Sequence, residues 1–306
     1  MTLRSSLGTA VVALSILTGA ASAQDFSAVQ IATTRVAPGI YRLAGEGGNI
    51  GLCIGPDGAL LIDDQYAELS EKIQAAVKEV TDQPIRYVVN THCHGDHTGG
   101  NEKLRKLGSL VIAQDNARRR MTESLVNEVF RVELPPPPPG NLPLLTFNDT
   151  VTFHLNGQTV EVVHVPPAHT DGDVLVHFHE ANVIHCGDLF SNGIFPFVDT
   201  SAGGSISGCI NAVDLILGRM NDSTKLIAGH GEPGTKEDLL TFRKMLETSR
   251  TRIQKAIDAG TDVTDLVTNK PLADLDDPWG QGWLPTDMYV RVVYASLIQE
   301  RDAKKK

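Results

Sequence analysis

The sequence contains few cysteines, and none of them forms a closely spaced pair. Cys53, Cys93, Cys186 and Cys209 are scattered along 306 residues, which excludes a zinc ribbon and a Cys-x-x-Cys redox motif. We expect buried free thiols. A disulfide remains an open alternative, because the chain carries an export signal, described below, and exported proteins can form them.

Positive charge is also scarce, since 27 Lys and Arg residues stand against 37 Asp and Glu residues and the formal net charge is −10. This balance argues against nucleic acid or an anionic membrane as a partner. Beyond the N-terminal segment, no apolar run approaches the roughly 20 residues that a membrane-spanning helix needs. The sequence therefore predicts no membrane insertion once that segment is removed.

The first 23 residues have the pattern of a secretory signal peptide. Arg4 supplies the positive end, an apolar run extends from about Val11 to Leu17, and Ala21-Ser22-Ala23 forms a cleavage site. The apolar run is short for a membrane anchor. We expect cleavage after Ala23 and a mature protein that begins near Gln24 in the periplasm.

The rest of the chain alternates short apolar runs with amphipathic segments, which predicts mixed α and β structure. Nine runs predict strands, at 49–55, 59–64, 85–90, 109–114, 151–155, 159–165, 173–179, 181–188 and 224–230. Three segments predict helices, at 66–80, 206–220 and 235–260. The similar outline of the two halves favours two packed sheets flanked by helices.

A proline-rich stretch, "LPPPPPGNLP" at 134–143, interrupts this pattern. Proline ends regular structure, so we expect an exposed loop that separates the first half from the second. A docking motif for a proline-recognising module is a less favoured alternative. The preceding residues from 125 extend this loop into a candidate flap over the substrate.

Four metal-capable side chains cluster in "VVNTHCHGDHTGGN", residues 88–101. His92, His94, Asp96 and His97 fall within six positions of a predicted strand–loop junction. Because His92 and His94 alternate onto one side while Asp96 and His97 turn toward a second position, the motif predicts ligands for more than one ion.

Three further ligand-type residues each follow the end of a predicted strand: His169, Asp188 and His230. Strand ends gather at one edge in α/β architectures, so these side chains can converge. Together the seven residues exceed one tetrahedral zinc site and suit two metals that share a bridge. We assign a packing or surface role to the remaining histidines, which lie within strand-like runs: His154, His164, His177, His179 and His185. His177 and His179 face one side together, but a metal site there is a less favoured alternative.

The motifs "THCHGDHTGG", "AHTDGD", "HCGD" and "AGHG", in this order, resemble those of the metallo-β-lactamase superfamily over roughly residues 35–235. Asp63, in "ALLIDD", matches an acidic residue that ends an early strand in that family. The resemblance implies an α/β fold of the four-layer αβ/βα sandwich type. It also implies that residues 24–306 form a single domain with a C-terminal helical extension.

The same resemblance implies a site with two Zn²⁺ ions. His92, His94 and His169 would hold the first ion, and Asp96, His97 and His230 the second. Asp188 would bridge the two ions or bind the second one, and Asp63 would orient the metal-binding loop. Cys93 would pack behind the site.

Two zinc ions would lower the pKa of a shared water and supply hydroxide at physiological pH. This hydroxide would attack the carbonyl of a small-molecule substrate, with Asp96 as the catalytic residue that orients the water and accepts its proton. The sequence therefore predicts a zinc-dependent hydrolase.

The substrate is less closely defined. Exported class B β-lactamases resemble this chain, but many carry cysteine where Asp188 stands and lysine where Ser191 stands, which argues against efficient β-lactam hydrolysis; Asn192 is a weaker candidate donor. The aspartate instead resembles glyoxalase II and related thioester or lactone hydrolases, although no basic glutathione-binding segment follows. Our first expectation is a β-lactamase-type activity, weak or shared with other substrates, and our alternative is a thioester or lactone hydrolase.

Two other classes stay open: a mononuclear iron persulfide dioxygenase using His92, His94 and His169, and a non-catalytic metal-binding protein.

Trp279 and Trp283 either fasten a C-terminal helix or cover the mouth of the site. The glycine-rich stretch 202–207 lacks the lysine of a phosphate loop, so we expect a turn before a helix. The sequence does not decide the oligomeric state.

Overall fold

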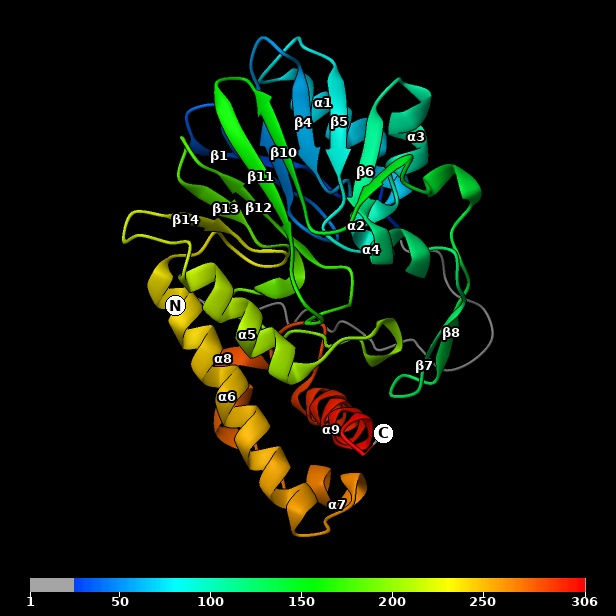
Figure 1. Ribbon diagram of the computed structural model, residues 1–306, viewed down its shortest axis with the longest axis vertical. Coiled ribbons are helices and arrows are strands. Elements are labelled where there is room, and N and C mark those ends of the chain that lie inside the picture. Colours follow the sequence, from blue (N-terminus) through cyan, green and yellow to red (C-terminus); the bar gives the residue numbers. More distant parts are fainter. Residues whose placement is uncertain (1–24, 306) are drawn as a thin grey trace, which may run out of the picture.

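Two β-sheets packed face to face form the centre of the molecule in a computed structural model that describes residues 25–305 (Figure 1). The predicted signal peptide, residues 1–23, lies outside the described residues. The first sheet has the order β1-β2-β3-β4-β5-β6-β9 and the second β10-β11-β12-β13-β14, while β7 and β8 form a separate hairpin.

The first sheet is antiparallel from β1 to β4 and parallel from β4 through β5 and β6 to β9. Its strands are β1 (Ala32–Ala37), β2 (Ile40–Ala44), β3 (Ile50–Cys53), β4 (Ala59–Ile62), β5 (Ile85–Val89), β6 (Leu110–Gln114) and β9 (Leu145–Phe147). The strands β3 and β4 are buried on both faces, which explains why their sequences are continuous apolar runs without alternation.

The second sheet is an antiparallel meander from β10 to β13 with the parallel strand β14 at its edge. Its strands are β10 (Thr150–Leu155), β11 (Gln158–His164), β12 (Val174–Phe178), β13 (Val183–His185) and β14 (Lys225–Ile227). The hairpin consists of β7 (Leu125–Asn127) and β8 (Val132–Leu134).

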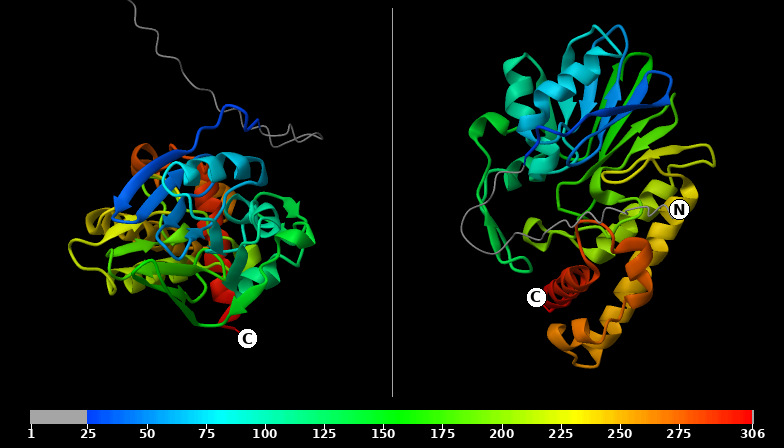
Figure 2. Two further views of the ribbon diagram at one scale, coloured as in Figure 1. Left: turned by 90° about the horizontal axis from the view of Figure 1, so that it is seen from above. Right: turned by 180° about the vertical axis from the view of Figure 1, so that it is seen from behind.

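Helices cover the outer face of each sheet and complete a four-layer αβ/βα sandwich (Figures 1 and 2). The first sheet carries α1 (Ser70–Lys78), α2 (Gly95–Thr98), α3 (Asn101–Lys106) and α4 (Asp115–Arg120) in its connections. The second sheet carries α5 (Ile206–Leu217) in the connection from β13 to β14, and it is followed by α6 (Lys236–Asp258), α7 (Val263–Thr268), α8 (Asp276–Trp279) and α9 (Thr286–Ala303). The fold class expected from the sequence is therefore confirmed.

Three buried apolar clusters hold these layers together. One cluster joins the inner faces of the two sheets, with Ile62 and Val176 among its members. A second packs the first sheet against α1, and a third packs the second sheet against α5, α6 and α9. Burial of apolar area is the main favourable contribution to such a fold, at roughly 25 cal/mol per Å².

All nine predicted strands and all three predicted helices are present, with ends that differ by a few residues. The long helix α6 begins where its sequence indicates, because Thr235 and Asp238 form a capping box. Ser205 caps α5, so the glycine-rich stretch 202–207 is a turn before a helix, as expected. The sequence did not predict β1 and β2, whose 32–44 segment is less apolar, nor the short strands β7, β8 and β9.

We expected the proline stretch to separate the first half of the chain from the second, and this expectation was wrong. After prolines 135–138, residues Pro139–Asn141 form a short 3-10 helix, and β9 then joins the first sheet parallel to β6. The first sheet is thus completed only at Phe147, because backbone hydrogen bonding to the open edge of β6 recruits the next strand-forming segment.

The four cysteines are free thiols, of which Cys53, Cys186 and Cys209 are buried and Cys93 is half-buried. Burial raises the pKa of the Cys53 thiol to about 11. Among the helices of the described residues, none is both long enough and apolar enough to cross a membrane.

Candidate metal centre

The seven predicted ligands meet at one edge of the sandwich, in the loops that follow strand ends. His92 and His94 follow β5, and Asp96 and His97 lie on the short helix α2. His169 follows β11, Asp188 lies in a single 3-10 turn after β13, and His230 follows β14. Residues separated by up to 138 positions are brought together because each chain segment leaves its sheet at the same edge.

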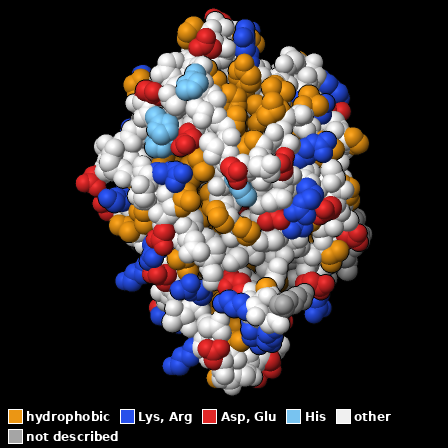
Figure 3. Space-filling model, in the orientation of Figure 1, with side chains coloured by type: hydrophobic (Ala, Val, Ile, Leu, Met, Phe, Trp, Pro, Cys, Tyr) orange, Lys and Arg blue, Asp and Glu red, His pale blue; other side chains and the backbone are white. Residues whose placement is uncertain are grey.

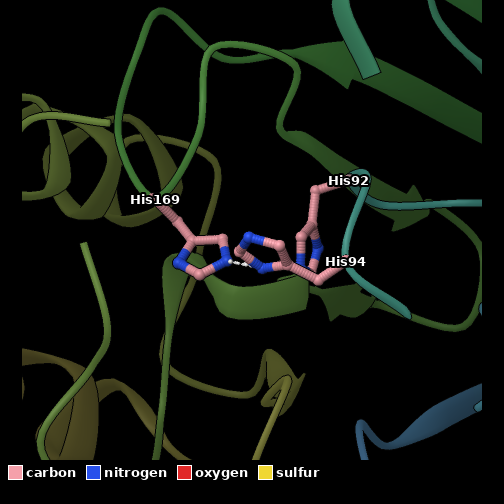
Figure 4. Close-up of side chains that lie close together, drawn as sticks. All are labelled: His92, His94 and His169. Carbon is pink, nitrogen blue, oxygen red and sulfur yellow. Dashed lines mark hydrogen bonds between the residues drawn. The ribbon is translucent and has the colours of Figure 1, made fainter. Parts of the chain in front are cut away.

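His92, His94 and His169 form the first ligand set, with ring nitrogens within 4.8 Å of one another. Figure 4 shows the three imidazoles converging from two loops. Nε2 of His169 lies 2.9 Å from Nδ1 of His94. The buried Nε2 of His92 has no hydrogen-bond partner. These three nitrogens are the ones directed at a shared point.

The opposite nitrogen of each ring is held by a neighbouring group. Nδ1 of His92 is 3.0 Å from the Thr91 hydroxyl, and Nε2 of His94 is 2.8 Å from a carboxylate oxygen of Asp199. Nδ1 of His169 is 2.7 Å from the carbonyl oxygen of Phe197. Such partners set the tautomer and the ring orientation of metal-binding histidines.

Asp96, His97 and His230 form the second ligand set. Nε2 of His230 lies 3.4 Å from Oδ2 of Asp96, and Nε2 of His97 lies 3.5 Å from the same oxygen. Nδ1 of the fully buried His97 is 2.7 Å from Oδ2 of Asp63. The predicted orienting role of Asp63 thus has a geometric basis.

Asp188 lies between the two sets. Its Oδ1 is 3.2 Å from Nε2 of His97, and its Oδ2 is 3.4 Å from Nε2 of His230. On the other side, Oδ2 is 3.6 Å from Nε2 of His169. With His92 and His97 it also forms a third potential ligand group, so it is the residue placed to contact ions in both sets.

Charge is distributed unequally over the two sets. In the first set, burial lowers the pKa of His92 well below its usual value and that of His169 to about 4, so these two rings are neutral and able to bind a metal. Burial also opposes protonation of His94, but Asp199 raises the pKa of that ring. In the second set, burial opposes protonation, yet Asp188 and Asp96 raise the pKa of His230 to about 10. Burial alone would raise the pKa of Asp188, but His230 and His97 hold it well below its usual value.

The residues fit the binding of a divalent cation. If His94 and His169 donate to Asp199 and to the Phe197 carbonyl, two unprotonated nitrogens face each other at 2.9 Å, which only a cation or a shared proton relieves. The unpartnered Nε2 of His92 points to the same need. Imidazole and carboxylate ligands in sets of three or four are those that zinc prefers.

Close packing around these side chains depends on glycines that the sequence analysis did not single out. A Cβ at Gly48 would overlap the imidazole ring of His97, and one at Gly229 would overlap Oδ1 of Asp188. Gly95, in the middle of the metal-binding motif, has nothing within 4 Å of such a Cβ.

We therefore expect Gly48→Ala to displace His97 and Gly95→Ala to be tolerated. The first change should cost about 1 to 3 kcal/mol of stability and lower kcat/KM roughly a hundredfold, as loss of ligand orientation does. Thermal unfolding and hydrolysis assays on both variants test this expectation. Equal activity in the two variants would show that the ring can move away without consequence.

Sequence reasoning missed Asp199, Thr91 and the carbonyl of Phe197. Asp199 and Phe197 lie about 30 residues from His169, and their local sequence has no ligand-type spacing. The carboxylate of Asp199 also accepts hydrogen bonds from Ser201, and a capping aspartate has no distinguishing sequence pattern.

Several other expectations are decided by local contacts. The side-chain amide of Asn192 donates to the carbonyls of Glu232 and Pro233, so it is not directed at a substrate. Ser191 is buried and pairs with His230 through the backbone.

Trp279 is 8% exposed and packs near Phe242, whereas Trp283 is 55% exposed. Trp279 is thus packed inside the protein, whereas Trp283 is exposed to solvent.

Comparison with known proteins assigns the family. Residues 44–230, more than half of the chain, match the metallo-beta-lactamase superfamily. The chain belongs to this superfamily. The matched range includes all seven candidate ligands.

Among curated relatives of this superfamily member, a hydroxyacylglutathione hydrolase of Pelagibacter ubique is 25% identical over 187 residues, which cover 58% of this chain and 68% of the relative. The hydroxyacylglutathione hydrolase of Rhodospirillum rubrum is 31% identical over 136 residues, which cover 44% of this chain and 45% of the relative. The second match therefore spans less than half of that enzyme.

Solved structures support the fold. A metallo-beta-lactamase from Pontibacter korlensis superposes with a TM-score of 0.59 at 20% identity, covering 71% of this chain and 99% of that one. The sec-alkylsulfatase Pisa1 from a Pseudomonas species gives a TM-score of 0.66 at 18% identity, covering 86% of this chain and 50% of that one. At this level of identity the likeness concerns the fold alone.

Proposed function

We propose that this protein is a di-zinc hydrolase that cleaves thioesters or related esters outside the cytoplasmic membrane. The observation that carries the proposal is Asp188, whose two carboxylate oxygens lie within 3.2 to 3.6 Å of ligand nitrogens from both sets. A bridging carboxylate is the feature that favours a glyoxalase II-like enzyme, and curated relatives named hydroxyacylglutathione hydrolase support the same reading.

Each part of the centre has a distinct role in this proposal. His92, His94 and His169 would hold one zinc ion and Asp96, His97 and His230 the other, with Asp188 between them. The ions would supply a nucleophilic hydroxide at neutral pH and polarise the substrate carbonyl. The Asp96 side chain is 23% exposed, so it is accessible to orient the attacking water and to accept its proton.

β-Lactam hydrolysis is the second candidate. The exported superfamily members that perform it supported our first expectation, but two features of this chain speak against it as the main activity. Ser191 is buried and unable to pair with a drug carboxylate, and the amide of Asn192 is engaged by backbone carbonyls. Hydrolysis of a thioester does not require a side chain that pairs with a drug carboxylate.

The periplasm remains our proposed location, on the basis of the N-terminal pattern in residues 1–23. An exported thioesterase would meet substrates other than a cytosolic glutathione conjugate. The proposal therefore does not require glutathione as the thiol part of the substrate.

An aromatic cluster of Phe130, Phe197 and Trp283 borders the first ligand set. The ring of Phe197 lies 6.0 Å from those of both His94 and His169. Phe130 follows at 5.5 Å and Trp283 at 5.9 Å from Phe197. Phe130 comes from the β7–β8 hairpin predicted as a flap, and the exposed Trp283 comes from the C-terminal part. We propose that these rings contact an apolar acyl group.

This contact predicts a dependence on acyl length. Each buried methylene contributes roughly 0.8 kcal/mol, so kcat/KM should rise from acetyl to hexanoyl thioesters. Trp283→Ala should reduce this gain about tenfold while leaving acetyl hydrolysis nearly unchanged. Val126→Ala is the matched control, because Val126 is exposed on the β7–β8 hairpin but is not one of the three aromatic residues. An unchanged chain-length profile in Trp283→Ala would rule out this role for the cluster.

The proposed activity is tested with the purified, zinc-loaded protein. Steady-state hydrolysis of an acyl thioester, S-lactoylglutathione, a lactone and a chromogenic cephalosporin should show the thioesters favoured by about a hundredfold in kcat/KM. A chelated sample and His92→Ala should be inactive. If the cephalosporin is the better substrate, the β-lactamase reading replaces ours.

A further inference from the structure

A second group of metal-capable side chains lies on the outer face of the second sheet, away from the centre described above. It consists of Glu161 on β11 with His177 and His179 at the end of β12, and one ligand atom from each lies within 4.8 Å of the others. The two imidazoles are stacked, with ring centroids 4.1 Å apart. Nε2 of His179 is 3.6 Å from a carboxylate oxygen of Glu161.

The strand register explains why these three residues meet. Glu161 pairs directly with His177 across β11 and β12, and His179 lies two residues further along the chain. Residues two apart in a strand share a face, and cross-strand partners lie about 5 Å apart at Cβ. The sequence spacing His-x-His therefore gains its third ligand only through pairing with β11.

The cluster is separate from the candidate metal centre. β12 begins beside that centre, where Val174 donates a backbone hydrogen bond to Thr91, and then runs away from it. At about 3.3 Å per residue, five residues of strand place His179 roughly 17 Å from Val174 along β12. On the outer face, histidine and acidic side chains lie next to each other above the helices (Figure 3).

The chemical state of the cluster suits a soft or borderline divalent cation. Burial and the neighbouring His179 lower the pKa of His177 to about 4, so this ring is neutral at physiological pH. His177 is only 8% exposed, which restricts its ring to one orientation. The nearby Arg219 also lowers that pKa, and its charge would weaken cation binding without removing a ligand.

We propose that Glu161, His177 and His179 form an additional binding site for a divalent transition-metal ion, with zinc as the reference ion. Two imidazoles and one carboxylate are a recognised zinc ligand set, and the remaining coordination positions would be filled by water. The three ligand atoms lie within 4.8 Å of one another, and bonds of about 2.0 to 2.2 Å to one ion require the side chains to rotate toward it. A bound ion links β11 to β12 and stabilises the outer sheet.

Metal counting on the untagged protein tests the proposal. Equilibrium dialysis against zinc, followed by metal analysis, should give one more ion per chain in the wild type than in His179→Ala. His154→Ala is the matched control. His154 is an exposed histidine on β10 that lies on the same face of the second sheet as Glu161 but outside the cluster. This control should bind as many ions as the wild type.

A second variant and a second readout complete the test. Glu161→Gln should weaken binding at this site about tenfold, and added zinc should raise the melting temperature of the wild type more than that of His179→Ala. Thioester hydrolysis should be equal in all variants, so failure of this site is distinguishable from failure of the proposed activity. Equal ion counts in wild type and His179→Ala, or an equal loss in His154→Ala, would overturn the proposal.

Discussion

Replacing Asp188 by alanine is expected to reduce hydrolysis at least about a thousandfold while leaving the protein folded. The side chain joins the two ligand sets through contacts with His97, His230 and His169. Its loss would remove several kcal/mol of transition-state stabilisation from the metal centre, and each 1.4 kcal/mol corresponds to a tenfold change in rate. The measurement is kcat/KM on the best thioester, with metal content and circular dichroism recorded in parallel.

Asp214→Asn is a suitable control for this variant. Asp214 is an exposed carboxylate on α5 that pairs with Arg243, and such surface pairs contribute about 1 kcal/mol or less. Its variant should keep wild-type activity and metal content. Retention of two tightly bound ions and substantial activity by Asp188→Ala would contradict the bridging role and, with it, the main support for the proposed function.

Asp63→Asn is expected to lower metal affinity and kcat/KM by about ten- to a hundredfold, although Asp63 touches no substrate. Its carboxylate accepts hydrogen bonds from the Thr91 backbone and hydroxyl, each at 2.7 Å, and holds Nδ1 of His97 at the same distance. The side-chain amide of asparagine would place its own N–H group opposite at least one of these N–H or O–H donors, so that hydrogen bond would be lost. Changes in groups that orient metal-binding histidines have effects of this size.

The neighbouring Asp64 offers a close comparison for this experiment. Asp63 has a positive φ of 66°, which asparagine tolerates, so the substitution changes hydrogen bonding with little backbone strain. Asp64 is equally buried, but it accepts one hydrogen bond from Gly100, and its other oxygen has no partner. Burial raises the pKa of Asp64 well above its usual value, so a neutral amide is a close substitute.

We therefore expect Asp64→Asn to retain most of the activity and metal affinity. Competition with a chromophoric chelator measures the affinity, and denaturant unfolding measures stability, for which we expect a loss of about 2 kcal/mol in Asp63→Asn. Similar losses in both variants would mean that any change near the loop is damaging. The specific role of Asp63 would then be lost.

The two competing substrate readings differ in what they require of the protein. β-Lactam recognition in our sequence-based expectation needed a donor near Ser191 or Asn192, and the backbone contacts of both residues leave none there. The complete second set of Asp96, His97 and His230 also speaks against the mononuclear dioxygenase. A thioester or ester hydrolase uses the groups that are present.

The sequence by itself determined much of the fold and all seven candidate ligands. Apolar runs and turn residues are local properties, so strands such as β4 and β5 could be predicted from their own residues. The candidate ligands could be found because their motifs follow predicted strands and resemble, in order, those of the superfamily. The strands β1 and β2 escaped prediction because their stability comes from pairing, of β1 with β2 and of β2 with β3, rather than from local composition.

Apart from Asp63, only the tertiary structure decided which groups orient the candidate ligands. Asp199, the Phe197 carbonyl and the space beside Gly48 act on histidines far away in the sequence, and no spacing rule connects them. The same holds for the aromatic cluster, which joins three segments more than 60 residues apart, and for the pairing of Glu161 with His177. The physical reason is common to all of them: hydrogen bonds and packing act over a few ångströms in space, and folding alone determines which distant residues come that close.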